Sequence, residues 1–284
     1  MTARSHPGRP GRTPGPTRAA SAGACRTRSR GSALGGSRAA TVALYRLDAR
    51  RAVAALPMGS IDVLITDPPY RTVARSGGHL KDWFGAGLSW RQIGAVLAVA
   101  RTRLAPDGVA FVMSNGAGLR EALEAMAAAG FERVRIVTWD RRYPGLGGGL
   151  RHQTEYVLVG QLPGSRTLSG TDLVSVAAVG PGTADRYPTE KPEGLGRELA
   201  RIANVRRGEL VLDPFCGSGA LLVGALERGA SVIGIDVADR AIRRASTRLG
   251  AAATRPAEWS ARTRPAKPAP GRRPAGRTTP RRRP

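Results

Sequence analysis

The sequence predicts an α/β fold built on a mostly parallel sheet, and two observations carry this prediction. Short apolar runs, among them residues 61–66, 210–213 and 231–236, have the length and composition of strands buried on both faces. Segments with helical spacing of apolar residues, such as 89–104, lie between these runs. Strands that alternate with helices in this way are typical of a parallel sheet covered by helices. With 284 residues and 41% hydrophobic content, the chain can bury such a core.

The first elements lead to a turn where chemistry is expected. A strand is expected in residues 41–48 and a helix in 49–56, which Pro57 ends. The next strand, 61–66, stops at Asp67-Pro68-Pro69-Tyr70, because two consecutive prolines neither extend a strand ladder nor enter a helix. The turn is therefore presented at the carboxyl edge of the sheet, where open α/β sheets bind ligands.

The middle of the chain predicts further helices and strands. Ser89 is expected to cap a helix that ends at 106–108. Residues 160–187 hold only short β-prone pieces, about enough for one hairpin, and Thr189 is expected to cap a helix through 203. The remaining expected elements are a loop in 71–88, a strand in 109–113, a helix in 117–129, a strand in 133–139, a loop in 141–149 and a strand in 152–159.

A second turn follows the strand 210–213. Its sequence is Phe215-Cys216-Gly217-Ser218-Gly219, and small residues let the backbone approach a ligand closely. After a helix, the strand 231–236 ends in Asp236, which lies 236 − 219 = 17 residues beyond Gly219. This arrangement predicts a nucleoside-binding half-fold, with the acid placed to accept hydrogen bonds from ribose hydroxyls. A nicotinamide or flavin enzyme is disfavoured, because Leu222 stands where its third glycine would be.

At these residues the chain resembles a known family, the amino-group DNA methyltransferases. Asp67-Pro68-Pro69-Tyr70 matches the catalytic tetrapeptide of this family, residues 215–219 match its Phe-x-Gly-x-Gly cofactor loop, and Pro188-Thr189-Glu190-Lys191-Pro192 resembles the segment upstream of that loop. The tetrapeptide precedes the loop, which is the permuted order called the β group. Over roughly 41–250, the resemblance implies a Rossmann-like seven-stranded methyltransferase sheet, circularly permuted, whose last strand is antiparallel.

The resemblance also implies a cofactor, a reaction and a set of site residues. The cofactor is S-adenosyl-L-methionine, and the methyl acceptor is the exocyclic amine of a base flipped out of the DNA stack. The side chain of Asp67 and the carbonyl of Pro68 are fixed hydrogen-bond acceptors for the amine, and they direct its lone pair toward the methyl group. Tyr70 stacks on the base. The catalytic residues are then Asp67, Pro68, Pro69 and Tyr70, and the cofactor residues Asp48, Lys191, Asp213, Phe215, Gly217, Ser218, Gly219 and Asp236.

The charge is concentrated at both ends of the chain. Of the net +24, residues 1–40 carry +8 and 251–284 carry +9, which leaves 24 − 8 − 9 = +7 for 41–250. Both ends are rich in Pro, Gly and Arg, which predicts disordered basic tails on one methyltransferase domain in 41–250. Basic tails suit a polyanion such as double-stranded DNA, although a skew toward arginine in the coding sequence would also produce them.

Several alternatives stay open from the sequence. Asp at the first tetrapeptide position favours adenine N6, and cytosine N4, an RNA base, or a silent nucleic-acid-binding protein on the same fold are the other readings. No signal-peptide or membrane-spanning run is present, which favours a cytoplasmic protein without a membrane partner. With 3 His and 2 Cys, no metal site is expected. A homodimer and a cognate restriction endonuclease are compatible partners that the sequence leaves open.

Overall fold

The fold is described from a computed structural model. It describes residues 39–70, 87–144, 149–179 and 189–250, all within one unit of the chain, Ser37–Pro284. Most of the predicted loop 71–88 and nearly all of the two predicted basic tails lie outside the described residues. The statements below concern the described ranges.

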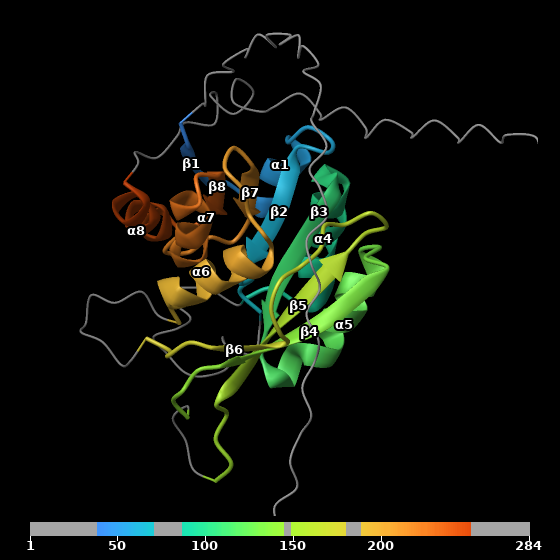
Figure 1. Ribbon diagram of the computed structural model, residues 1–284, viewed down its shortest axis with the longest axis vertical. Helices are drawn as coiled ribbons and strands as arrows, with labels where there is room; N and C mark the ends of the chain where they lie inside the picture. The colour runs from blue at the N-terminus through green and yellow to red at the C-terminus, as the bar shows by residue number, and fades with distance from the viewer. Residues whose placement is uncertain (1–38, 71–86, 145–148, 180–188, 251–284) are drawn as a thin grey trace, which may run out of the picture. The chain divides into compact units, whose positions relative to one another are not determined.

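The described residues form one sheet of eight strands (Figure 1). The strand order is β1-β8-β7-β2-β3-β5-β4-β6, and every neighbouring pair is parallel except the two pairs made by β5. This order confirms the predicted methyltransferase-like sheet, in which β5 is the antiparallel strand. The sheet has one strand more than the seven predicted, the short edge strand β6. The strands are β1 Val42–Arg46, β2 Ile61–Thr66, β3 Leu104–Ser114, β4 Arg133–Asp140, β5 Thr154–Gln161, β6 Leu173–Ser175, β7 Leu210–Asp213 and β8 Ser231–Asp236.

Helices cover both faces of the sheet. On one face, α1 (Ala49–Ala54), α4 (Trp90–Arg103) and α5 (Leu119–Ala128) pack on a core that contains Ile61 and Leu64 of β2. On the other, α6 (Glu193–Ile202), α7 (Val223–Glu227) and α8 (Asp239–Leu249) pack on a core that contains Val63 and Ile65. Val63, Leu64 and Ile65 thus point to alternate cores, as the two-residue repeat of a strand requires, and Ile61 departs from the repeat where the β2–β3 register shifts. None of the described helices is long and apolar enough to cross a membrane.

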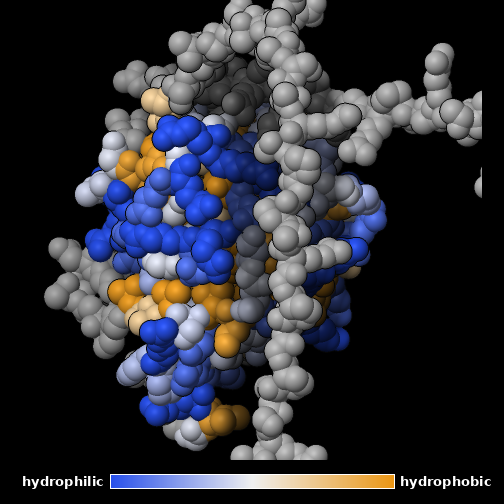
Figure 2. Space-filling model, viewed as in Figure 1, coloured by the Kyte–Doolittle hydropathy of each residue, from blue (hydrophilic) through white to orange (hydrophobic). Residues whose placement is uncertain are grey.

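The outer surface of the face carrying α6 and α7 is largely hydrophilic, with smaller apolar patches (Figure 2). Ion pairs cross it, among them Arg197 with Glu227 at 2.8 Å and Arg201 with Glu198 at 2.8 Å. Beneath them the two helices lie very close together, because a Cβ at Gly224 of α7 would meet Cα of Arg197 at 2.4 Å. Only a glycine allows this approach of the two backbones.

Several local predictions are confirmed and others are wrong. Ser89 caps α4 with a complete capping box, as expected. The predicted stop at 106–108 lies inside β3 instead, where the β2–β3 register shifts and accommodates it as a strand irregularity. Thr189 does not cap α6, because Pro192 is the N-cap and Thr189 has a φ of 58° in a preceding turn.

The hairpin expected in 160–187 is not present in the part of this region that the structure describes, 160–179. The β-prone piece there forms only β6, which pairs parallel to β4 at the edge of the sheet. The expected helix in 117–129 begins with a short 3-10 turn, Gly116–Gly118, before α5. The helix expected after the glycine turn is divided into a 3-10 turn, Ala220–Leu222, and α7.

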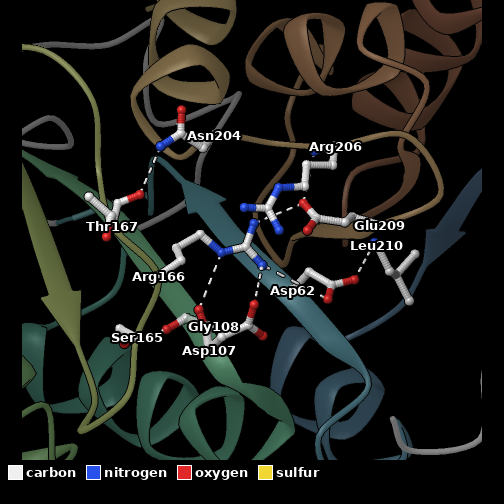
Figure 3. Close-up of polar contacts among 10 residues, drawn as sticks. All are labelled: Asp62, Asp107, Gly108, Ser165, Arg166, Thr167, Asn204, Arg206, Glu209 and Leu210. Carbon is white, nitrogen blue, oxygen red and sulfur yellow. Dashed lines mark hydrogen bonds and ion pairs between the residues drawn. The ribbon is translucent and has the colours of Figure 1, made fainter. Parts of the chain in front are cut away.

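A buried charge cluster holds the β5–β6 connection across the amino ends of three strands (Figure 3). Nη1 of Arg166 contacts Oε2 of Glu209 at 2.8 Å, and Nη2 lies 3.5 Å from Oδ2 of Asp107 and 3.9 Å from Oδ1 of Asp62. Oδ2 of Asp62 accepts the backbone N–H of Leu210 at 2.8 Å. Because Arg166 is only 7% exposed, this arginine neutralises charge that would otherwise be buried alone.

Candidate active site

A cavity of about 1170 Å³ opens at the carboxyl ends of β1, β2, β7 and β8. From β7 the chain continues to β8 on one side, and from β2 it continues to β3 on the other, so the crevice lies where the direction of strand addition reverses. Open α/β sheets bind ligands at this place. Every residue predicted for the site lines the cavity except Gly219.

The Asp67-Pro68-Pro69-Tyr70 turn directly follows β2. The carbonyl of Pro68 accepts the backbone N–H of Tyr70 at 2.9 Å, and the carbonyl of Pro69 accepts that of Leu88 at 2.6 Å. A carbonyl oxygen has two lone pairs, so that of Pro68 keeps one for a ligand. The ring of Tyr70 stacks on Trp90 with centroids 5.7 Å apart and planes at 14°, which fixes its position. Burial raises the pKa of Tyr70, so its hydroxyl stays protonated.

The carboxylate of Asp67 has one engaged and one free oxygen. Oδ2 accepts from Nζ of Lys191 at 2.5 Å, whereas Oδ1 is buried and has no hydrogen-bond partner among the described residues. Burial raises the pKa of Asp67, although the ammonium of Lys191 acts in the opposite direction. Lys191 was predicted among the cofactor residues, and the structure places its ammonium against this catalytic candidate.

Lys191 lies between two carboxylates. Its Nζ is also 3.4 Å from Oε2 of Glu155 in β5, and its side chain is 9% exposed. Burial lowers the pKa of Lys191, but the charges of Asp67 and Glu155 outweigh burial, so the pKa is raised and the ammonium stays charged. Sequence reasoning did not select Glu155. Its only signal was an acid in a strand entered through polar residues, three positions after His152, with Thr154 where the family that the sequence resembles has a histidine.

The glycine turn after β7 is fixed by hydrogen bonds to β8. The N–H of Gly217 donates to Oδ2 of Asp236 at 3.1 Å, and Gly217 has a φ of 49°. Gly219 has a φ of 77° and faces away from the cavity, where a Cβ would come within 3.1 Å of Ala245 in α8. Gly217 and Ser218 therefore line the site, while Gly219 serves the turn and the packing of α8.

Two acids stand at the ends of β7 and β8, Asp213, which is buried, and Asp236, which is partly buried. Oδ1 of Asp213 accepts from Oγ1 of Thr66 at 2.6 Å and from the N–H of Phe215 at 3.0 Å. Burial raises the pKa of Asp213 to about 7 despite these two hydrogen bonds. The carboxylate of Asp236 accepts the backbone N–H groups of Gly217 and Ala238, and burial raises its pKa as well.

Asp48 and Cys216 complete the account of the predicted residues. Asp48 caps α1 by accepting the N–H of Arg51 at 3.0 Å, and it lies exposed at the edge of the cavity. Cys216 is buried, which raises the pKa of its thiol well above the ordinary value and disfavours a thiolate nucleophile. Among the described residues, no group of three or more His, Cys, Asp and Glu side chains is placed to hold a metal ion.

The sheet order, the glycine turn and the acids at the strand ends are those of the Rossmann-like methyltransferase fold, and the Asp67-Pro68-Pro69-Tyr70 turn precedes the glycine turn in the chain. A family model described as DNA methylase matches residues 163–247. The chain is similar to the N6/N4 DNA amino-methyltransferase family.

Two curated relatives show the same similarity over most of their length. The chain is 25% identical over 226 residues to the type II methyltransferase M2.DpnII of Streptococcus pneumoniae, an alignment that covers 68% of this chain and 83% of the relative. Identity to M2.LlaDCHI of Lactococcus lactis subsp. cremoris is 25% over 229 residues, covering 69% and 84%.

Two solved structures share the fold. M1.HpyAVI in complex with SAM superposes with a TM-score of 0.57 at 19% identity, over 74% of this chain and 99% of that one. The PvuII cytosine-N4-specific DNA methyltransferase superposes with a TM-score of 0.59 at 14% identity, over 74% and 86%. At these identities the likeness is one of fold.

Proposed function

We propose that this chain is a site-specific DNA methyltransferase that transfers a methyl group from S-adenosyl-L-methionine to the N6 amine of a flipped-out adenine. The observation that carries the proposal is the shared cavity. Asp67, whose buried Oδ1 is unpartnered among the described residues, lines the same space as the turn at Gly217 and the carboxylate of Asp236. An acceptor for an amine N–H therefore shares one cavity with a site suited to a nucleoside.

The lining residues fit S-adenosyl-L-methionine. The cavity, about 1170 Å³, is larger than ordinary ligand pockets of roughly 300–1,000 Å³, so a cofactor and a base have room together. Asp236 accepts two backbone N–H groups and keeps further lone pairs for ribose hydroxyls. The carboxylate of Asp67, with its unpartnered Oδ1, suits a cationic ligand. When bound, this cofactor supplies a methyl group made electrophilic by a positively charged sulfur.

Asp67 and Pro68 act on the amine. Oδ1 of Asp67 accepts one N–H of the amine, and the remaining lone pair of the Pro68 carbonyl accepts the other. Because both acceptors are fixed by the turn, they draw the nitrogen toward tetrahedral geometry at no cost of reorganisation. A new nitrogen–carbon bond would form as the bond between that carbon and the sulfur breaks and leaves a neutral thioether, and Asp67 is the base that takes the proton from the nitrogen.

An amine inside a stacked duplex does not reach this cavity. The base must be flipped out, at a cost of a few kcal/mol that contacts in the pocket offset. Tyr70 lines the cavity and is held by Trp90, so it is a fixed surface on which the base stacks. Adenine is proposed over cytosine because the tetrapeptide begins with Asp67, by resemblance to the family.

The test is methyl transfer by the purified protein. Labelled S-adenosyl-L-methionine is supplied with double-stranded DNA of mixed sequence, and modified bases are mapped by sequencing. We expect N6-methyladenine at one short sequence, and we expect Asp67→Ala to lower the rate about 100- to 1,000-fold while still binding the cofactor. A parallel assay supplies RNA in place of DNA. Label at cytosine N4, label only in RNA, or cofactor binding without transfer to any nucleic acid would each refute the adenine proposal.

The remaining assignments extend the same proposal. Residues 41–250 form the methyltransferase domain, and the basic segments 1–40 and 251–284 add affinity for DNA phosphates. The two named relatives are type II methyltransferases, which is consistent with a paired restriction endonuclease. A homodimer and a cytoplasmic location stay predictions from the sequence.

A further inference from the structure

Three side chains from three separate segments form a line of alternating charge beside the cavity. Oδ2 of Asp67 is 2.5 Å from Nζ of Lys191, and Nζ is 3.4 Å from Oε2 of Glu155. Their side chains are 20%, 9% and 16% exposed, so water screens this contact weakly. We propose that Glu155 is a positioning residue that shares the ammonium of Lys191 with Asp67 and thereby keeps Asp67 a strong hydrogen-bond acceptor for the amine. This inference rests on the proposed function.

The proposal follows from what Lys191 alone would do to Asp67. An ammonium paired only with Asp67 would stabilise the carboxylate and lower its basicity. Acceptors and bases of lower basicity assist proton movement less in a transition state. A second carboxylate on the far side of the ammonium draws part of its charge away, so Glu155 offsets this loss. Glu155 does not line the cavity, so it acts on the amine only through Lys191.

Glu155 is itself held in place from the outside. Its Oε1 lies 3.6 Å from Nη1 of Arg141 at the end of β4, which leaves Oε2 directed at Lys191. Oε2 is buried and makes no hydrogen bond among the described residues, so the ammonium of Lys191 is the group there that compensates its charge. Leaving a buried carboxylate oxygen in this way is costly unless an ammonium stays beside it.

The titratable and charged groups that face Asp67 come from every element around it. Glu155 raises its pKa and Lys191 lowers it. The groups are Lys191 from the segment before α6, Glu155 from β5, Tyr70 from the same turn and Asp213 from β7, with Arg141 behind Glu155. Because the charge of Glu155 raises the pKa of Asp67, its removal must lower that pKa.

The decisive variant is Glu155→Gln, which keeps the shape and removes the charge. We expect kcat for DNA methylation to fall about 10- to 100-fold while the KM for S-adenosyl-L-methionine changes less than about 3-fold. The acidic limb of the kcat profile should move to lower pH. Glu155→Asp, which restores the charge, should recover part of the rate. Glu198→Gln, which removes an acid paired with Arg201 on the outside of α6, is the matched control and should leave both kinetic constants unchanged.

A double-mutant cycle tests whether Glu155 acts through Lys191. In a Lys191→Met background, Glu155→Gln should lower kcat less than about 2-fold further, because the ammonium that it shares is already absent. An undiminished effect in that background would overturn the proposal. So would a normal kcat in the single variant, or a fall in kcat with no shift of the acidic limb, since a purely structural role would lower the rate without moving the limb.

A readout independent of activity separates this inference from the proposed function. The carboxyl carbon of Asp67 is titrated by NMR in the cofactor-free protein and assigned with Asp67→Asn. A lower titration midpoint in Glu155→Gln than in the wild type supports the coupling even if no nucleic acid is methylated, which would refute only the proposed function. Equal midpoints overturn the coupling, whatever the wild-type protein methylates.

Discussion

The hydroxyl of Thr66 donates a 2.6 Å hydrogen bond to Oδ1 of Asp213, and both side chains are fully buried. Thr66 is the last residue of β2 and Asp213 the last of β7, so this bond joins the two strand ends that carry the Asp67-Pro68-Pro69-Tyr70 turn and the glycine turn. The relative position of the two turns therefore depends on a side-chain contact as well as on the strand pairing of β2 with β7.

Replacing Thr66 by Val keeps the shape of the side chain and removes the hydroxyl. We expect Thr66→Val to lower the free energy of unfolding by about 1–3 kcal/mol, because a buried carboxylate loses a donor. Urea denaturation measures this change. Thr66→Ser retains the donor and should lose less than half as much. A Thr66→Val variant as stable as the wild type, with the loss confined to Thr66→Ser, would mean that the methyl group, and not the hydrogen bond, stabilises this contact.

The pH dependence of stability should report Asp213. Burial raises its pKa to about 7, whereas an Asp in the unfolded chain titrates near 3.8. Between these values the folded protein holds a proton that the unfolded chain has released, so the contribution of Asp213 to stability falls as pH rises. Relative to Asp213→Asn, the wild-type protein should lose on the order of a few kcal/mol between pH 4 and 7. Parallel stability curves for the two proteins would contradict this assignment.

Asp236 should control affinity for the cofactor. Asp236→Ala removes the carboxylate that fixes Gly217 and faces the cavity, and we expect the Kd for S-adenosyl-L-methionine to rise about 10- to 100-fold. Calorimetric titration measures it. Asp239→Asn changes an acid three residues away that pairs with Arg243 outside the cavity, and it should bind normally. An unchanged Kd in the Asp236 variant would exclude the predicted contact.

The buried cluster at the opposite edge should govern stability alone. Arg166→Met leaves Asp62 and Glu209 buried without their cation, and we expect a loss of about 3–5 kcal/mol in the free energy of unfolding. Arg197→Met removes an exposed ion pair and should cost at most about 1 kcal/mol. Similar small costs for both would show that water reaches the Arg166 cluster. Where Arg166→Met remains folded, cofactor affinity should be that of the wild type.

Much of the fold could be predicted because its signals are local. The Ser89 cap, the apolar run of β2 and its termination by two prolines all lie within a few residues of sequence. The edge strand β6 was mistaken for a hairpin because its partner, β4, lies more than 30 residues earlier in the chain. Helix α8 was not predicted, although Ile242, Ala245 and Leu249 have helical spacing and are buried in the structure.

The sequence by itself determined the two turns, their order in the chain, and hence the carboxyl edge at which acids and glycines gather. Tertiary structure alone decided which charges meet there. Glu155 and Lys191 are 36 residues apart, and Thr66 and Asp213 are 147 apart. Contacts of this kind arise from strand order and side-chain direction, which no local pattern encodes, and a buried ion pair forms only where the packed sheet excludes water from both partners.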